Sequence, residues 1–169
     1  MINNKKTALQ EAAEQVANNT TGWIGHVPGQ KETIARGQTF IANAEGDLQV
    51  IEIFSNIVSD PGKVVMTLHH FDPQARSWGP ALGSASVEFQ KADCGKWVAF
   101  NMPGLRLDKG KYYGFRLDSQ DSYIGVGEAA GSAKQPPFSP GQEWEFTPDN
   151  QKGDCFSYFS LAYKVGIRA

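Results

Sequence analysis

Apolar and polar residues alternate along much of the chain after position 37. The alternation is clearest in KWVAFNM (residues 96–102) and KYYGFRL (residues 111–117). Because successive side chains of a β-strand point to opposite faces of a sheet, this pattern predicts two half-buried strands. The residues assigned to the buried face are Val98, Phe100, Met102, Tyr113, Phe115 and Leu117. If residues 96–117 form a hairpin, the opposite face is shared by Trp97, Asn101, Tyr112 and Arg116.

About eight segments resemble strands, and turns rich in Gly, Pro and Asp separate nearly all of them. The predicted strands are residues 38–42, 48–56, 63–71, 81–89, 96–102, 111–117, 122–128 and 155–165. Short strands joined by frequent turns are typical of an antiparallel β-sandwich or barrel. The chain contains neither GxGxxG nor GxxxxGK[ST], and no long helical connection follows position 37. These observations exclude a parallel α/β fold with its nucleotide-binding sites.

One segment has the composition of a helix. Residues 7–16, TALQEAAEQV, are rich in Ala, Glu and Gln, and their apolar positions fall at helical spacing. Asn18 and Asn19 follow and would end the helix. The segment has too few large apolar residues for a core of its own. We therefore expect a short N-terminal helical extension or linker over residues 1–21 and a single β-domain over residues 22–169.

The composition is that of an ordinary globular domain. The 169 residues carry a net charge of -2 at pH 7, and 20% of them are charged. Lysines and arginines are scattered and form no basic run, so nucleic acid is not expected as a partner. No apolar stretch approaches the ~20 residues that span a bilayer, and the N-terminus lacks the apolar segment of a signal peptide. We expect no membrane insertion.

Two cysteines and three histidines form no recognisable catalytic or metal-binding motif. Cys94 and Cys155 belong to no C-x-x-C sequence, and the histidines show no H-E-x-x-H spacing. Each cysteine precedes a strand-like run, so the two thiols either form one disulfide at an end of a sheet or stay free. Carboxylates are plentiful, but most lie in turns, and nothing selects a glycosidase pair among them.

The order of several motifs resembles that of a known module. Over residues 37–165, GQTFIANAEGDLQVIEIF, GPALGSASVEF, GKWVAFNM, LDKGKYYGF and CFSYFSLAYKV are similar to strands of galactose-binding-like jelly-roll modules in bacterial surface and carbohydrate-active proteins. The resemblance implies an all-β fold, an antiparallel jelly-roll β-sandwich of about eight strands, preceded here by the short helix. It also implies a non-catalytic module that binds carbohydrate or recognises a surface, and that is secreted or held at the cell surface.

Such modules often hold a structural Ca²⁺, and no other cofactor is expected. Asp118, Asp121 and Glu128, or Asp149 with Asp154, would supply the oxygen ligands that this ion prefers. The spaced D-x-D-x-D pattern of a dedicated calcium loop is missing.

Aromatic side chains supply the candidate carbohydrate site. A sugar ring offers an apolar face to Trp or Tyr and hydroxyl groups to neighbouring polar side chains. Tyr112 and Arg116 share one face of their strand, with Gly114 between them leaving a shallow dent. The full candidate set is Tyr112, Arg116, Trp97, Asn101, Trp144, Tyr123 and Trp78. In a plainer interpretation, Tyr112 and Arg116 lie on an ordinary solvated face and Trp144 closes one end of the domain.

Two other functions stay open on the sequence alone. A structural or adhesive domain of a larger surface protein would contact another protein domain through the predicted helix and the proline-rich loop GSAKQPPFSPGQ. A hydrolase would place carboxylates in the loops at one end of the sandwich. We expect a binding module and not an enzyme, with carbohydrate or another protein domain as its partner.

Overall fold

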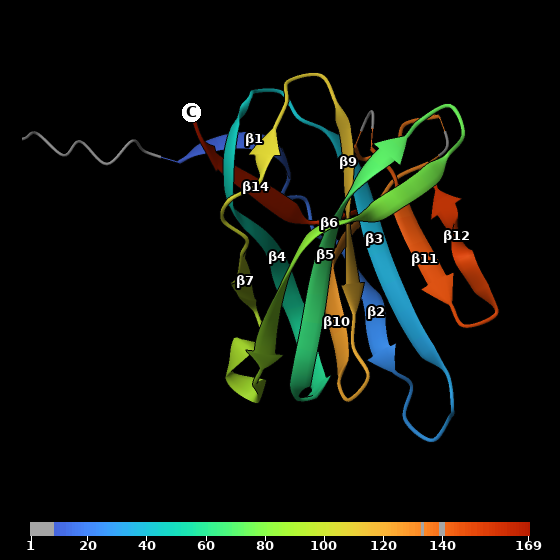
Figure 1. Ribbon diagram of the computed structural model, residues 1–169. Helices are drawn as coiled ribbons and strands as arrows, with labels where there is room; N and C mark the ends of the chain where they lie inside the picture. The colour runs from blue at the N-terminus through green and yellow to red at the C-terminus, as the bar shows by residue number, and fades with distance from the viewer. Residues whose placement is uncertain (1–8, 133, 139–140) are drawn as a thin grey trace, which may run out of the picture.

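Antiparallel β-strands make up nearly all of the regular structure. The computed structural model describes residues 9–132, 134–138 and 141–169 and is shown in Figure 1. Its strands are β1 (Gln10–Gln15), β2 (Thr20–His26), β3 (Thr33–Ile41), β4 (Gly46–Asp60), β5 (Gly62–Asp72), β6 (Ser77–Phe89), β7 (Lys96–Asn101), β8 (Arg106–Leu107), β9 (Tyr112–Asp118), β10 (Tyr123–Ala130), β11 (Glu143–Thr147), β12 (Asn150–Phe156), β13 (Phe159–Leu161) and β14 (Tyr163–Arg168). One 3₁₀ turn, η1 (Lys91–Asp93), lies between β6 and β7. Within the described ranges, no helix is long and apolar enough to cross a membrane.

The strands form one sheet that curls back on itself at β3. Residues 33–34 of β3 pair with β2 and residues 35–38 pair with β11 at the same edge, while residues 36–41 pair with β9 at the other edge. The main path of the sheet is β1-β14-β4-β10-β2-β3-β9-β5-β6, with β7 and β8 on β4, β13 on β10, and β12 on β11. We call β3, β9, β5, β6, β11 and β12 the front half and the remaining strands the back half (Figure 1).

The apolar core lies between the two halves. Met66 and Phe115 of the front half and Ile51 and Ile124 of the back half are each 0% exposed and belong to one cluster. A strand that covers a core on one face and meets solvent on the other needs one apolar residue in two, which explains the alternation in the sequence. The six side chains that this alternation assigned to the core over residues 96–117 are all buried, so that prediction is confirmed.

The expected hairpin over residues 96–117 is wrong. β7 pairs with β4 in the back half, whereas β9 pairs with β3 and β5 in the front half. After Gly104, which has a φ of 93°, the chain pairs briefly with β4 through β8 and then crosses to the other half. The outward side chains of β7 therefore share no face with those of β9.

The predicted N-terminal helix is wrong where the structure describes it. Residues 10–15 form β1, which pairs with β14, and Ala12 and Ala13 are buried in the main core. Pairing at a strand edge and burial of these alanines outweigh the modest helix preference of a short Ala- and Glu-rich segment. Because β1 and β2 both belong to the sheet, the described part of residues 1–21 is no separate extension. The start of the predicted helix, residues 7–8, lies outside the described residues.

The C-terminal part of the chain contains more strands than its pattern indicates. β11 and β12 form a hairpin in a stretch where the pattern assigned no strand before residue 155 (Figure 1). The single strand predicted over residues 155–165 is divided into the end of β12, β13 and the first half of β14. The chain breaks because these pieces have different partners, β11, β10 and β4.

Replacing Ala12 by Asp tests whether β1 is part of the core. Ala12 is 0% exposed, so an unpaired carboxyl group there is expected to lower the free energy of unfolding by about 2 to 4 kcal/mol. Gln10→Asp puts the same group at an exposed position of β1 and should change that free energy by less than about 0.5 kcal/mol. Urea unfolding measures both effects. Equally small effects would show that β1 is not packed on the core.

Candidate functional site

The turn of the β5–β6 hairpin lies beside β11 and β12 (Figure 1). Asp72 shapes this turn, because its Oδ1 accepts hydrogen bonds from the backbone amides of Gln74 at 2.9 Å and Ala75 at 3.1 Å. Arg76 completes it in the left-handed region with a φ of 53°. Irregularities in the β5–β6 register just before the turn bend the hairpin. The bend carries Trp78 over the outer face of the front half.

The indole of Trp78 lies against two glycines on adjacent strands. A Cβ atom at Gly114 of β9 would come within 2.4 Å of the indole, and one at Gly37 of β3 within 2.8 Å, so a side chain at either position would collide with it. Four aromatic rings meet the indole edge-on, with ring centroids 5.4 to 5.9 Å away; they belong to His69, Phe71, Trp144 and Phe146. The dent expected at Gly114 is therefore present in the backbone but filled by Trp78.

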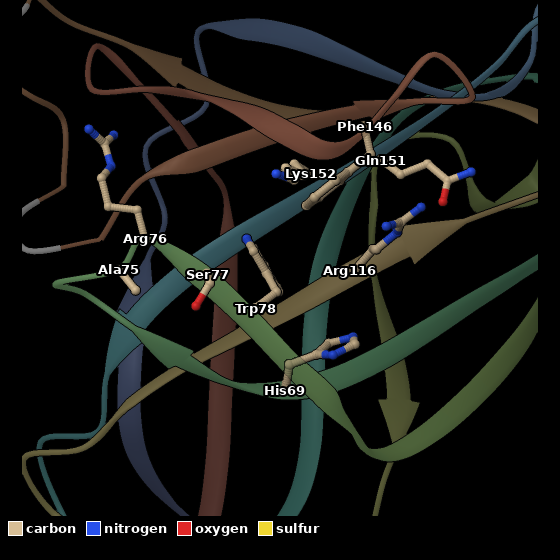
Figure 2. Close-up of a pocket in the computed structure, with 9 residues that line it drawn as sticks. All are labelled: His69, Ala75, Arg76, Ser77, Trp78, Arg116, Phe146, Gln151 and Lys152. Carbon is tan, nitrogen blue, oxygen red and sulfur yellow. The ribbon is translucent and has the colours of Figure 1, made fainter.

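A cavity of about 380 Å³ opens beside the indole (Figure 2). Its lining residues are His69, Ala75, Arg76, Ser77, Trp78, Arg116, Phe146, Gln151 and Lys152. The volume lies within the range of small-molecule sites, ~300 to 1,000 Å³. Arg76, Arg116 and Lys152 make the lining cationic, and no carboxylate of the described residues belongs to it. The indole Nε1 of Trp78 is buried and has no hydrogen-bond acceptor in the described part of the protein.

Two neighbours hold Arg116 in place. Its guanidinium lies over the ring of Phe146, 4.3 Å from the centroid, which is a cation–π contact. Its Nε and Nη2 donate to the carboxylate of Asp118 at 2.9 and 3.2 Å. Nη1 takes no part in either bond. The guanidinium is thus oriented before a ligand arrives, with donor capacity left over.

His69 supports the cavity wall through both of its ring nitrogens. Nδ1 lies 2.8 Å from the carbonyl oxygen of Gly79, and Nε2 lies 2.8 Å from Oγ1 of Thr67. Because a carbonyl oxygen only accepts, Nδ1 carries a proton and donates it to Gly79. His70 points to the opposite face, as the strand pattern predicts, and stacks on the core residue Tyr113.

Two further hollows continue the cavity along the outer face of the front half. One of about 290 Å³ shares Arg116 and Gln151 with the cavity and extends to Asp118. Another of about 280 Å³ shares Arg76 and extends to Tyr112. We call the cavity and these two hollows the front groove.

A buried ion cluster lies on the inner face of β3, behind the front groove. Arg36 donates to Glu143 at 3.2 Å and lies 3.2 Å from a carboxylate oxygen of Glu145. Its Nε donates to the carbonyl oxygen of Trp23 at 2.9 Å. Glu143 is 0% exposed and Glu128 of β10 is 4% exposed. β2 and β11 pair with successive parts of the same edge of β3, and the cluster lies at the boundary between them. It holds β11 against β3, and the outer face of β11 carries aromatic rings of the site.

The surroundings of Glu143 keep its carboxyl group protonated. Burial, together with a hydrogen bond and repulsion from Glu128, raises its pKa to about 10, and Arg36 only partly opposes this shift. Its Oε1 is buried and has no hydrogen-bond partner within the described residues, which also favours the neutral acid.

Four of the seven predicted ligand residues come together in or under the front groove. They are Tyr112, Arg116, Trp78 and Trp144. The other three lie on the back half. Trp97 meets Phe54 edge-on at 5.3 Å, and Asn101 is exposed at the end of the same strand, β7. Tyr123 of β10 stacks on Trp23 of β2, with ring centroids 4.7 Å apart.

Trp144 supports the site from below and does not form its surface. It is 4% exposed and packs with Phe71 and Trp78. The plainer interpretation of this residue, as a tryptophan that closes part of the domain, therefore describes its position better. Tyr112 is half-buried at the edge of the same aromatic cluster.

Sequence reasoning missed several residues that line the cavity. Phe146 was detectable, because alternation in EWEF, residues 143–146, puts two aromatic side chains on one face of a strand. Arg76 and Lys152 carry no such signal. One lies in the β5–β6 turn and the other on β12, and only the folded chain brings them together.

The disulfide alternative is wrong. Cys94 and Cys155 are both free thiols. The sulfur of Cys94 accepts a hydrogen bond from the backbone amide of Val58 in the back half. Cys155 lies on β12 in the front half, where Arg76 donates to its sulfur. The two residues are held on different halves of the sheet, so their sulfurs do not meet.

The three carboxylates predicted to bind calcium are engaged separately. Asp118 pairs with Arg116, and Oδ1 of Asp121 accepts from the backbone amide of Lys63 at 3.0 Å. Glu128 belongs to the buried ion cluster. Across the ranges that the structure describes, no three His, Cys, Asp or Glu side chains are arranged to hold a metal ion. Calcium binding stays a prediction without a site formed by these residues.

Comparison with known proteins adds a likeness of fold. No protein-family model matches the chain, and no curated protein sequence matches it. Among solved structures, a clostridial cysteine protease, Cwp84 after propeptide cleavage, is similar, with a TM-score of 0.52 at 10% sequence identity. The alignment covers 98% of this chain and 41% of that one. At this identity the likeness concerns the fold alone and transfers no activity or site residue.

Adding a methyl group at Gly114 is expected to displace Trp78. Gly114→Ala should lower the free energy of unfolding by about 1 to 3 kcal/mol, because its Cβ would lie 2.4 Å from the indole. In a Trp78→Ala background the same change should cost less, since the indole is gone. A double-mutant cycle followed by urea unfolding measures this coupling. Equal costs in the two backgrounds would contradict the packing described above.

The raised pKa of Glu143 predicts how stability depends on pH. Between the ordinary pKa of 4.5 and about 10, the folded protein holds a proton that the unfolded chain has released. Rising pH therefore lowers the free energy of unfolding over this interval, by at most about 1.4 kcal/mol per pH unit. Glu143→Gln replaces the protonated acid by a neutral amide of similar size, and should remove this part of the slope.

Urea unfolding between about pH 5 and pH 9 compares the slopes. Glu88→Gln, which changes an exposed carboxylate on β6, is the matched control and should keep the wild-type slope. A Glu143→Gln protein with the wild-type slope would show that Glu143 is ionised in the folded protein.

Proposed function

We propose that the protein is a non-catalytic carbohydrate-recognition module with a galactose-binding-like jelly-roll sandwich fold, and that its ligand lies in the front groove. One observation carries the proposal: a single cavity of about 380 Å³ pairs an aromatic wall with unused hydrogen-bond donors. Trp78 and Phe146 supply the wall, and Arg116, Gln151 and Lys152 supply donors.

The chemistry of a sugar ring suits this lining. A pyranose has a C–H face that packs on aromatic rings, and hydroxyl oxygens that accept hydrogen bonds. The wall is preformed, because Trp78 rests on two glycines, and Arg116 is oriented by Phe146 and Asp118. A preformed site loses less conformational freedom on binding, which favours affinity for a polar ligand.

Binding without turnover agrees with the groups that line the cavity. The imidazole of His69 has both nitrogens engaged in hydrogen bonds. The protonated acid Glu143 lies on the inner face of the sheet and not in the groove. Hydrolysis of a glycosidic bond needs two opposed carboxyl groups, and the described residues that line the cavity include none.

Glycan-array screening followed by calorimetry tests the proposal. Trp78→Ala is expected to weaken binding of a retained glycan by about tenfold, the effect of losing an aromatic contact in a partly desolvated site. Trp97→Ala removes a half-buried tryptophan from the back half and should change affinity by less than about twofold. Gln151→Ala, at an exposed position, is a second variant in case Trp78→Ala loses its packing. Circular dichroism checks that each variant is folded.

A wild-type protein that retains no glycan would overturn the proposal. Binding that is lost in Trp97→Ala, but kept in folded Trp78→Ala and Gln151→Ala, would overturn the assignment of the ligand to the front groove.

A further inference from the structure

Positive charge is concentrated in one part of the front groove. The cavity is lined by Arg76, Arg116 and Lys152, and the hollow that reaches Tyr112 shares Arg76; the described lining of both lacks a carboxylate. The hollow on the Arg116 side contains Asp118, which is already paired with that arginine. The chain as a whole has a net charge of -2, so the positive region is local and does not follow from composition.

These cations keep unused donors. Arg76 donates a hydrogen bond to the sulfur of Cys155, and Nη1 of Arg116 takes no part in the two bonds to Asp118. The ammonium of Lys152 makes no salt bridge with a described residue. In Figure 2 the indole nitrogen of Trp78 points toward the end of the Lys152 side chain, and this N–H is buried without an acceptor. Cationic groups and a buried donor that face one cavity together favour an anionic acceptor there.

The front groove is also longer than its central cavity. Next to the cavity of about 380 Å³ lie hollows of about 290 and 280 Å³; the first shares Arg116, Phe146 and Gln151 with it and the second shares Arg76. Tyr112 lines one end and Asp118 the other. Continuous hollows of this kind suit an extended ligand better than a single compact one.

We infer that the ligand is an acidic polysaccharide, a chain of sugars that carry carboxylate groups, laid along the front groove. One carboxylate binds the ammonium of Lys152 beside the indole N–H of Trp78, and the neighbouring sugars occupy the two hollows. The ammonium and the indole N–H give this carboxylate one charge-assisted and one neutral hydrogen bond. The guanidiniums of Arg76 and Arg116 lie on either side (Figure 2) and add electrostatic attraction. The inference rests on the proposed function and names the class of its ligand.

Uronate polymers and their methyl esters separate the effect of charge from that of sugar shape. Polygalacturonate, alginate and hyaluronan, each beside its methyl-esterified form, are titrated with the wild-type protein in a calorimeter. At least one acid is expected to bind about tenfold or more tightly than its ester, since a charge-assisted hydrogen bond is lost with the charge. Raising the salt concentration should weaken that binding, because part of it comes from exposed charges.

Two substitutions locate the charge contact. Arg76→Gln and Lys152→Gln change exposed side chains, so both proteins are expected to fold. Each substitution should weaken binding of the acidic polymer by about tenfold. Lys96→Gln removes an exposed cation from β7 on the back half and is the matched control, with less than about a twofold effect.

Three results would each contradict the inference. Acids and esters could bind equally well, or neutral glycans could bind better, while Trp78→Ala still weakens glycan binding. Either result would overturn the acidic ligand and leave the carbohydrate proposal standing. Failure of every glycan, charged or neutral, would overturn both. Acid binding that Lys96→Gln weakens as much as Lys152→Gln would be a general charge effect and would also overturn the inference.

Discussion

The packing of the Trp78 indole on the backbone of two neighbouring strands is the contact on which the candidate site depends. Gly37 and Gly114 lack side chains where β3 and β9 run side by side, and the indole occupies the space. This contact requires the β5–β6 hairpin to bend, and the same bend brings Arg76 to the cavity. One structural feature therefore sets both the aromatic wall and a cation beside it.

The inner face of the front half carries a buried charged cluster, and its outer face carries aromatic rings. On the inner face, Arg36 and Glu143 form a buried pair beside Glu128, which raises the pKa of Glu143. On the outer face, Trp144 and Phe146 support the groove. Adjacent residues of a strand point to opposite faces, so the short segment EWEF of β11 serves both. A buried ion cluster adds little net stability but is costly to break, and here it fixes where β11 lies along β3.

Local pattern predicts which side chains are buried better than it predicts which strands pair. One-sided burial imposes a period of two on β7 and β9, so their core residues can be assigned from sequence. Pairing is a long-range property, and residues 96–117 resemble a hairpin although β4 and β3 take the two strands apart. Residues 10–15 resemble a helix until β14 offers an edge. Likewise, Gly114 predicts a dent, but its occupation by Trp78 depends on three strands meeting in space.

The indole N–H resonances of the four tryptophans test the central claim most directly. In a proton–nitrogen correlation spectrum, assigned by single Trp→Phe variants, titration with oligomers of the uronate polymer that binds is predicted to shift the Trp78 resonance, because its Nε1 lacks an acceptor among the described residues beside the cavity. The resonances of Trp23 and Trp97, which lie on the back half, should keep their positions. Shifts at Trp23 or Trp97 with an unmoved Trp78 resonance would contradict the account.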